Sequence, residues 1–116
     1  MAMLFPMACC IAGCAPSSPE RVLGGDPRAG AIAITRHACG SCHLIPGVQD
    51  ADGRVGPSLG EFGSRRMIAG WVPNTPEALR AYLLDPQGLV PGNVMPNQGL
   101  TDRQARDIAA FLEGQR

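Results

Sequence analysis

Two cysteines and a histidine lie close together in the segment Cys39-Gly40-Ser41-Cys42-His43. Two thiols at this spacing can add to the two vinyl groups on one edge of a porphyrin, and the tight turn between them places the next imidazole under the iron as an axial ligand. Without the histidine, the cysteines would also be compatible with a thiol–disulfide redox pair or half of a zinc site. The motif therefore predicts one covalently attached haem c, held by Cys39 and Cys42, with His43 as an iron ligand.

The second axial position of the iron has few candidates in this chain. The other histidine, His37, precedes the motif on a predicted helix and is expected at the surface. Met95 lies in a proline-braced loop, Pro91–Pro96, which can hold a thioether against the far face of a porphyrin. Met67 follows two arginines in a segment with some helical character and is expected in the core. We favour Met95 as the ligand, and an open sixth position stays the alternative. A His/Met pair raises the reduction potential and leaves no place for a substrate, which favours electron transfer over catalysis.

The remaining cysteines lie in the apolar start of the chain: Cys9, Cys10 and Cys14. This stretch is too short to span a bilayer but has the length of a signal-peptide core. Its end, Ile11-Ala12-Gly13-Cys14, looks like a bacterial lipobox, in which the chain is cleaved before a cysteine that then carries lipid. We therefore expect a signal peptide over residues 1–13 and a lipid anchor on Cys14, at the periplasmic side of a bacterial membrane. The stretch has no basic residue, so an ordinary cleaved signal or an uncleaved anchor stays an alternative.

The basic and acidic residues of the chain are equal in number. The sequence has ten of each, and every basic residue is arginine. Nucleic-acid binding would call for a basic excess, so we expect no nucleic-acid partner. The chain also lacks the lysine-rich face that steers many diffusing electron carriers to their partners, a need that is weaker for a tethered carrier. Because aromatic residues are few and a domain of this size buries a modest share of its surface, we expect the form without haem to be poorly folded.

Three helix starts are visible in the sequence, each at an N-capping side chain. The first two have a proline at the first helical position, and the third has a capping box with a glutamine three residues later. Apolar residues at helical spacing follow each start. The predicted helices run from about Pro27 to Ala38, from Thr75 to about Asp85 and from Thr101 to about Gly114.

The stretches between these helices contain many turn-forming residues and no strand pattern. They predict long loops, which are implausible in a compact domain without a cofactor to wrap. Residues 14–25 are rich in proline, serine and glycine and are expected to form a flexible linker. The sequence therefore predicts one all-α domain over residues 26–116, with three main helices and long loops around one haem.

The order of these motifs resembles that of the class I c-type cytochromes. A helix is followed by the attachment motif, by Gly56-Pro57-Ser58-Leu59, by Met95-Pro96 and by a terminal helix with an aromatic residue, Phe111. The resemblance covers about Gly25 to Arg116 and implies the cytochrome c fold. It also implies that the Pro57 carbonyl orients the His43 ring through its second nitrogen.

Further roles follow only from this resemblance. It implies that Arg65 binds a haem propionate. Trp71 either shares that task through its indole N–H or is a buried structural tryptophan. Phe111 on the last helix is expected to pack over Gly30 on the first.

The resemblance can be narrowed to the cytochrome c domain fused to subunit II of some bacterial haem–copper oxidases. The copper-binding half of that subunit has no counterpart in this sequence, so the resemblance implies a free-standing relative that is a donor or accessory subunit for a terminal oxidase. The segments that carry this similarity are Gly53–Pro57, Ile68–Gly70, Pro73–Glu77, Asp85–Gln87 and Pro91–Pro96.

The leading hypothesis is a periplasm-facing, lipid-anchored, monohaem c-type cytochrome that transfers single electrons in a respiratory chain. Its expected partners are respiratory redox proteins, among them a terminal haem–copper oxidase, and it is expected to be no enzyme and to take no small-molecule substrate. One alternative is a redox or gas sensor in which Met95 dissociates from the iron. Another is a peroxidase-like catalyst, or the haem subunit of a larger oxidoreductase, with a displaceable sixth ligand.

Overall fold

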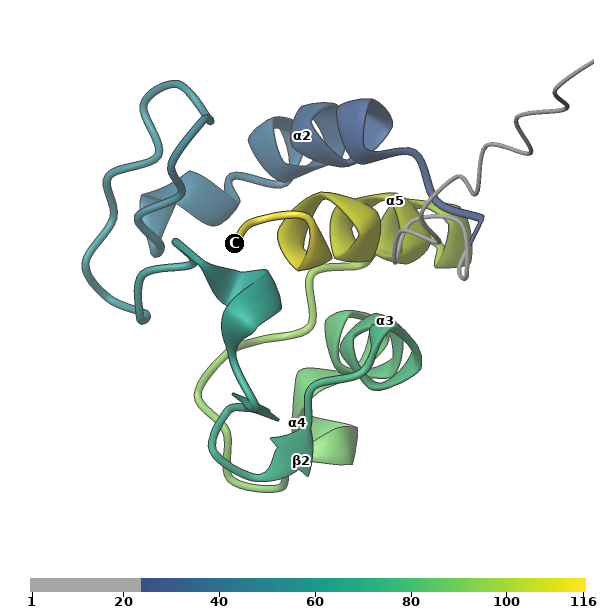
Figure 1. The fold of residues 1–116 in the computed structure, drawn as a ribbon. Helices are drawn as coiled ribbons and strands as arrows, with labels where there is room; N and C mark the ends of the chain where they lie inside the picture. Colours follow the sequence, from purple (N-terminus) through teal and green to yellow (C-terminus); the bar gives the residue numbers. More distant parts are fainter. Residues whose placement is uncertain (1–23) are drawn as a thin grey trace, which may run out of the picture.

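A computed structural model describes residues 24–116, which are mostly helical (Figure 1). The predicted signal peptide, Cys14 and most of the predicted linker lie outside the described residues. Within that range no helix is both long and apolar enough to cross a membrane. The elements in chain order are α2 (Pro27–Arg36), the 3-10 turns η1 (Cys39–Ser41) and η2 (Phe62–Ser64), strands β1 (Met67–Ile68) and β2 (Val72–Pro73), and helices α3 (Pro76–Leu84), α4 (Pro86–Leu89) and α5 (Asp102–Glu113).

The three main helices, α2, α3 and α5, begin where the sequence predicts, and the all-α architecture is confirmed. The caps are Asp26, Thr75 and Thr101, whose side chains accept hydrogen bonds from the backbone N–H groups of Arg28, Ala78 and Gln104. Each such cap stabilises a helix by about 1 kcal/mol. Helix α2 ends at Arg36, slightly before the predicted Ala38, because Ala38 takes the left-handed conformation with φ of 54° and turns the chain toward η1.

Helices α2 and α5 lie against each other at the top of the molecule in Figure 1. Gly30 of α2 faces the main chain of α5 so closely that a Cβ there would overlap the carbonyl of Asp107. The Asp107 side chain is buried, and its Oδ1 accepts the backbone N–H of Asp26 at 2.9 Å. Gly30 therefore lies against the backbone of Asp107. Phe111, which was expected to pack over Gly30, lines a shallow hollow together with Ala31. The close approach of two backbones therefore fixes how α2 crosses α5.

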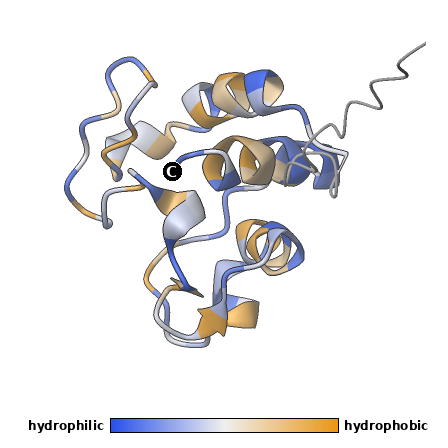
Figure 2. Cartoon of the chain, viewed as in Figure 1, coloured by the Kyte–Doolittle hydropathy of each residue, from blue (hydrophilic) through white to orange (hydrophobic). Residues whose placement is uncertain are grey.

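Helix α3 lies below α5, and the core fills the space among the main helices and η2 (Figure 1). Figure 2 shows hydrophilic residues at the N-terminal end of α5 and hydrophobic ones toward its C-terminal half, which faces this core. The larger buried side chains are Ile34, Ile45, Phe62, Ile68, Leu79, Leu83, Ile108 and Leu112.

A two-stranded hairpin and a short helix between the main helices differ from the predicted loops. Strands β1 and β2 pair antiparallel around Ala69 and Gly70, which both have positive φ. Because neighbouring strand residues point to opposite faces, Ile68 is buried and Met67 is 41% exposed. The prediction of a helical, core-packed Met67 is therefore wrong. Helix α4, which the sequence analysis left in a loop, begins directly after α3 and is capped by Asp85.

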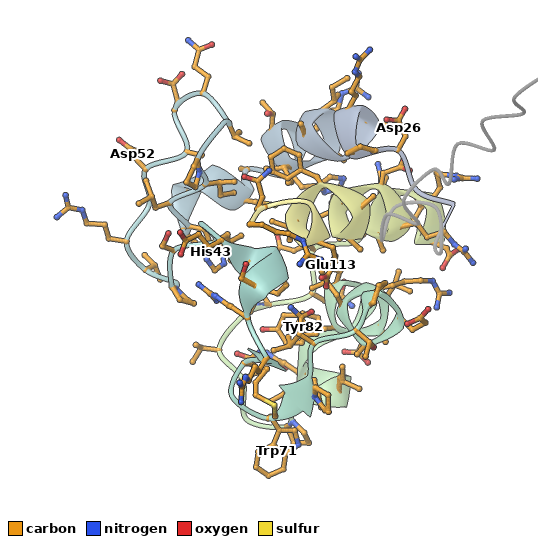
Figure 3. The ribbon with its side chains drawn as sticks, in the orientation of Figure 1. Asp26, His43, Asp52, Trp71, Tyr82 and Glu113 are labelled. Atoms are coloured by element: carbon orange, nitrogen blue, oxygen red, sulfur yellow. The ribbon has the colours of Figure 1, made fainter. Side chains whose placement is uncertain are left out.

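A buried carboxyl group lies near the end of α5, above Tyr82 of α3 (Figure 3). Glu113 is 4% exposed, and its Oε1 makes no hydrogen bond within the described part of the chain. Burial raises the pKa of Glu113 above its ordinary value; the charge of Arg116 opposes this rise and that of Glu77 adds to it. The folded protein therefore disfavours ionisation of Glu113.

We expect Glu113→Gln to raise the free energy of unfolding of the haem-loaded protein at neutral pH. At a pH below the pKa of a glutamate in the unfolded chain, Glu113 is protonated in both the folded and the unfolded protein. Ionisation of Glu113 then causes no difference in stability between the wild type and the variant. As the pH rises from there toward the higher folded-state pKa, the wild type loses stability relative to the variant. Urea unfolding from about pH 4 to about pH 8 measures this difference. A difference that is constant over this range, or one that the exposed control Glu61→Gln reproduces, would contradict the assignment.

Candidate haem-attachment site

The attachment motif begins where α2 ends. The left-handed Ala38 redirects the chain into η1, and the backbone N–H groups of Cys42 and His43 both donate to the carbonyl of Cys39, at 3.2 and 3.0 Å. Cys39 is half-buried, Cys42 is exposed, and neither is in a disulfide. Burial raises the pKa of the Cys39 thiol, partly offset by a backbone hydrogen bond. The turn therefore presents two free, neighbouring thiols and an imidazole from one compact segment.

The imidazole of His43 is oriented by a residue 14 positions further along the chain. Its Nδ1 lies 2.7 Å from the carbonyl oxygen of Pro57. Because a carbonyl only accepts hydrogen bonds, Nδ1 must carry the proton, and the lone pair of Nε2 is available to a metal ion. This is the tautomer that an axial ligand needs, so His43 and the two thiols fit a covalently attached haem.

The loop from Leu44 to Pro57, at the left of Figure 1, lies directly on the attachment motif. The N–H of Gly56 donates to Cys42 at 2.7 Å, and that of Gly53 donates to Gly40 at 3.0 Å. Three glycines permit this contact because a Cβ on any of them would overlap its neighbour. These pairs are Gly40 with Ala51, Gly53 with the backbone of Ser41, and Gly56 with the His43 ring. The sequence indicated Gly56 only as part of a motif. The close backbone contacts of the three glycines could not be predicted from it, because they join residues far apart in the chain.

Arg65, predicted to bind a propionate, lies next to the segment that holds His43. Its guanidinium donates to the carbonyl of Ser58, the residue after Pro57, and lies 5.3 Å from the centroid of the Phe62 ring. Asn74, which the sequence analysis missed, donates from Nδ2 to the carbonyls of both Phe62 and Arg65, each at 3.1 Å. The side chains of Arg65 and Asn74 thus fasten η2 to the Pro57–Ser58 segment and to the start of α3.

Met95 is on a separate segment between α4 and α5 and is half-buried. The backbone N–H of Met95 donates to Oδ1 of Asn93 at 3.4 Å, and Nδ2 of Asn93 donates to the hydroxyl of Tyr82 on α3. Nδ2 of Asn97 donates to the carbonyl of Leu84 at 3.3 Å. The prolines of this loop were recognised from the sequence, but the asparagines that attach it to α3 were not. An asparagine two residues before Met95 and another two residues after it form the pattern that could have indicated these contacts.

Trp71 is not brought together with the other predicted residues. It comes directly before β2 in the chain and lies at the far end of the molecule, with its ring directed away from His43 (Figure 3). It is 67% exposed, so the alternative of a buried structural tryptophan is wrong. The turn at Ala69 and Gly70, with a positive φ at both, places Trp71 at the tip of the hairpin.

Comparison with known proteins gives consistent matches. The family model for cytochrome c matches residues 28–115. Subunit 2 of the cytochrome c oxidase of Alkalihalophilus pseudofirmus is 36% identical over 83 residues, covering 72% of this chain and 23% of that subunit, so the chain spans about a quarter of this relative's length. Cytochrome c2 iso-2 of Magnetospirillum fulvum is 35% identical over 87 residues, covering 65% of this chain and 88% of that protein. Among solved structures, cytochrome c2 from Rhodobacter sphaeroides has the same fold, with a TM-score of 0.58 at 23% identity over 76% of this chain and 94% of that one.

Gly56→Ala should disturb the imidazole of His43, because the added methyl group would overlap the ring. Overpacking of this kind typically costs about 1–3 kcal/mol. We expect the variant to unfold at lower urea concentration and to show shifted His43 ring-proton resonances in NMR spectra of the oxidised haem-loaded protein.

Gly114→Ala is the matched control, since its Cβ would make only ordinary contacts near the end of α5. It should leave the His43 ring-proton resonances unchanged. Unshifted resonances in Gly56→Ala would contradict the tight fit around His43.

Proposed function

The chain belongs to the cytochrome c family, and from that premise we propose that it is a lipid-anchored carrier of single electrons on the periplasmic side of a bacterial membrane. Members of this family bind one haem c covalently and transfer electrons, and so does this chain. The observation that carries the proposal of a haem-binding electron carrier is the hydrogen bond between His43 Nδ1 and the Pro57 carbonyl, which holds the ring with Nε2 free.

We assign the site residues as follows. Cys39 and Cys42 would hold the haem through two thioether bonds, and His43 and Met95 would bind its iron. The bound haem supplies a one-electron redox couple. Of the chain's own residues, Pro57 would orient the imidazole and Arg65 would offset negative charge; we assign the propionate contact to Arg65 without Trp71.

Ligation by Met95 distinguishes a carrier from a gas sensor or a catalyst. A sensor or catalyst needs an open or weakly held sixth position, whereas a carrier gains from a ligand that stays in place. Two asparagines fasten the loop of Met95 to α3, one through Tyr82 and one through the carbonyl of Leu84. This bracing supports a held ligand, and therefore electron transfer.

Met95→Ala should abolish the far-red charge-transfer band that a methionine–iron bond produces in the oxidised haem-loaded protein. The variant should also have a lower reduction potential, because methionine ligation raises it, and the reduced variant should bind carbon monoxide readily. Optical spectroscopy and potentiometry measure these effects. Ready binding of carbon monoxide by the untreated wild type would favour the sensor or catalyst instead.

We propose a terminal haem–copper oxidase as the electron acceptor. The support is the similarity to the curated relatives that are named cytochrome c oxidase subunit 2. Their full length is about four times that of the matched region, so the partnership is inferred from one part of those proteins. The absence of lysine from the sequence fits a carrier that meets its partner in a thin layer at a membrane rather than by long-range attraction.

Cys14→Ser should prevent incorporation of radiolabelled palmitate, which should label the wild-type protein expressed in bacteria. The reduced wild type should be oxidised by a purified haem–copper oxidase in vesicles, and more slowly by that oxidase when Cys14→Ser has removed the anchor. An unlabelled wild type would rule out the lipid anchor. A labelled wild type that the oxidase does not oxidise would rule out this partner and leave the anchor standing.

A further inference from the structure

The side chain of Asn93 connects the Met95 main chain to helix α3. Its Oδ1 accepts the backbone N–H of Met95 at 3.4 Å, and its Nδ2 donates to the hydroxyl of Tyr82. We infer that Asn93 is a positioning residue that sets where Met95 stands relative to the rest of the haem pocket. This inference rests on the proposed role of Met95 as the sixth ligand.

An asparagine is suited to this position because its amide carries a donor and an acceptor on one rigid group. The main chain of Asn93 is itself held, since its N–H donates to the carbonyl of Val90 at 3.1 Å across the turn at Gly92. Gly92 has a φ of 83°, a conformation that favours glycine. Three hydrogen bonds therefore converge on the residue two positions before Met95. Val94, between them, is 93% exposed and anchors nothing.

The other end of this connection is fixed in the protein core. Tyr82 lies on α3 between Leu79 and Leu83, which are 1% and 7% exposed, and Tyr82 itself is packed against the core cluster (Figure 3). A hydroxyl on such a residue moves little relative to the helix. The hydrogen bonds of Asn93 therefore connect the backbone of Met95 to a helix that packs on the core.

Asn97 provides a comparison within the same loop. It also ties the loop to α3, through the carbonyl of Leu84 at 3.3 Å, and its Oδ1 accepts the N–H of Gly99 at 2.8 Å. Within the described residues Asn97 makes no hydrogen bond with Met95, so it braces the loop without contacting the ligand's own amide. Loss of Asn97 should weaken the loop, whereas loss of Asn93 should release Met95 itself.

The test compares three variants of the haem-loaded protein. Asn93→Ala removes both side-chain hydrogen bonds, the one to the Met95 N–H and the one to the Tyr82 hydroxyl. We expect it to raise the rate of carbon monoxide binding to the reduced protein about tenfold, which corresponds to about 1.4 kcal/mol, and to weaken the far-red band of the oxidised protein. Asn93→Asp should restore nearly wild-type values, because a carboxylate can accept from both the Met95 N–H and the Tyr82 O–H. Asn97→Ala should lower the urea midpoint and should change the band and the binding rate less than Asn93→Ala does.

A double-mutant cycle provides a second measurement if Asn93→Ala folds poorly. Tyr82→Phe and Asn93→Ala break the same hydrogen bond, so their effects on carbon monoxide binding should be less than additive. Additive effects, a wild-type band in Asn93→Ala, or an equal loss of the band in Asn97→Ala would overturn the inference and leave Met95 as the ligand. Absence of the band from the wild type would overturn both the inference and the proposed ligation.

Discussion

The hydrogen bond from His43 to the Pro57 carbonyl is the constraint on which the haem side of the structure depends. It joins a turn at the end of α2 to a point 14 residues away, so the intervening loop must return to a defined place. The loop can do this because Gly53 and Gly56 lie directly on the attachment motif with no side chain between them. Arg65 then secures the next carbonyl, that of Ser58. A short attachment motif thus requires a long, closely fitted loop.

The two proposed iron ligands belong to different parts of the fold, and α5 joins these parts. His43 follows α2, which crosses α5 where Gly30 meets Asp107. Met95 is fastened to α3, whose Arg80 donates to Asp102 at the start of α5 at 2.6 Å. Hydrogen bonds from Arg106 and Arg80 lower the pKa of Asp102, which keeps this carboxylate ionised. The backbone carbonyl of Gln115, two residues after the end of α5, accepts the N–H of Gly63 in η2 at 2.7 Å. The spacing between the ligands is therefore a property of how α2 and α3 pack on one helix.

The sequence predicted best those features whose residues are neighbours in the chain. The attachment motif and the caps Asp26, Thr75 and Thr101 are local, and the helices begin where these residues predict. The β1–β2 hairpin was missed because a strand of two residues shows no periodicity. Met67 was misplaced for the same reason. The contacts of Gly40, Gly53, Asn74 and Asn93 each depend on a partner that only the folded chain brings near, so the residue type alone could not reveal them. What could be predicted was the chemistry of the site, and what could not was the set of contacts that makes it rigid.

That rigidity has a consequence for the kind of reaction the site supports. Transfer of a single electron makes and breaks no bond to a substrate, so a site serves it best when its ligands hold the same positions before and after. The groups that position the two proposed ligands are the main-chain carbonyl of Pro57, next to the carbonyl that Arg65 secures, and the short amide of Asn93. These groups have few rotatable bonds, and they are attached to elements that pack on α5. A sensor would need one ligand on a mobile element, whereas the loop of Met95 is attached to α3 at both Asn93 and Asn97. The distribution of these attachments therefore favours a carrier, in which the segments of both proposed ligands are attached to helices that pack on α5.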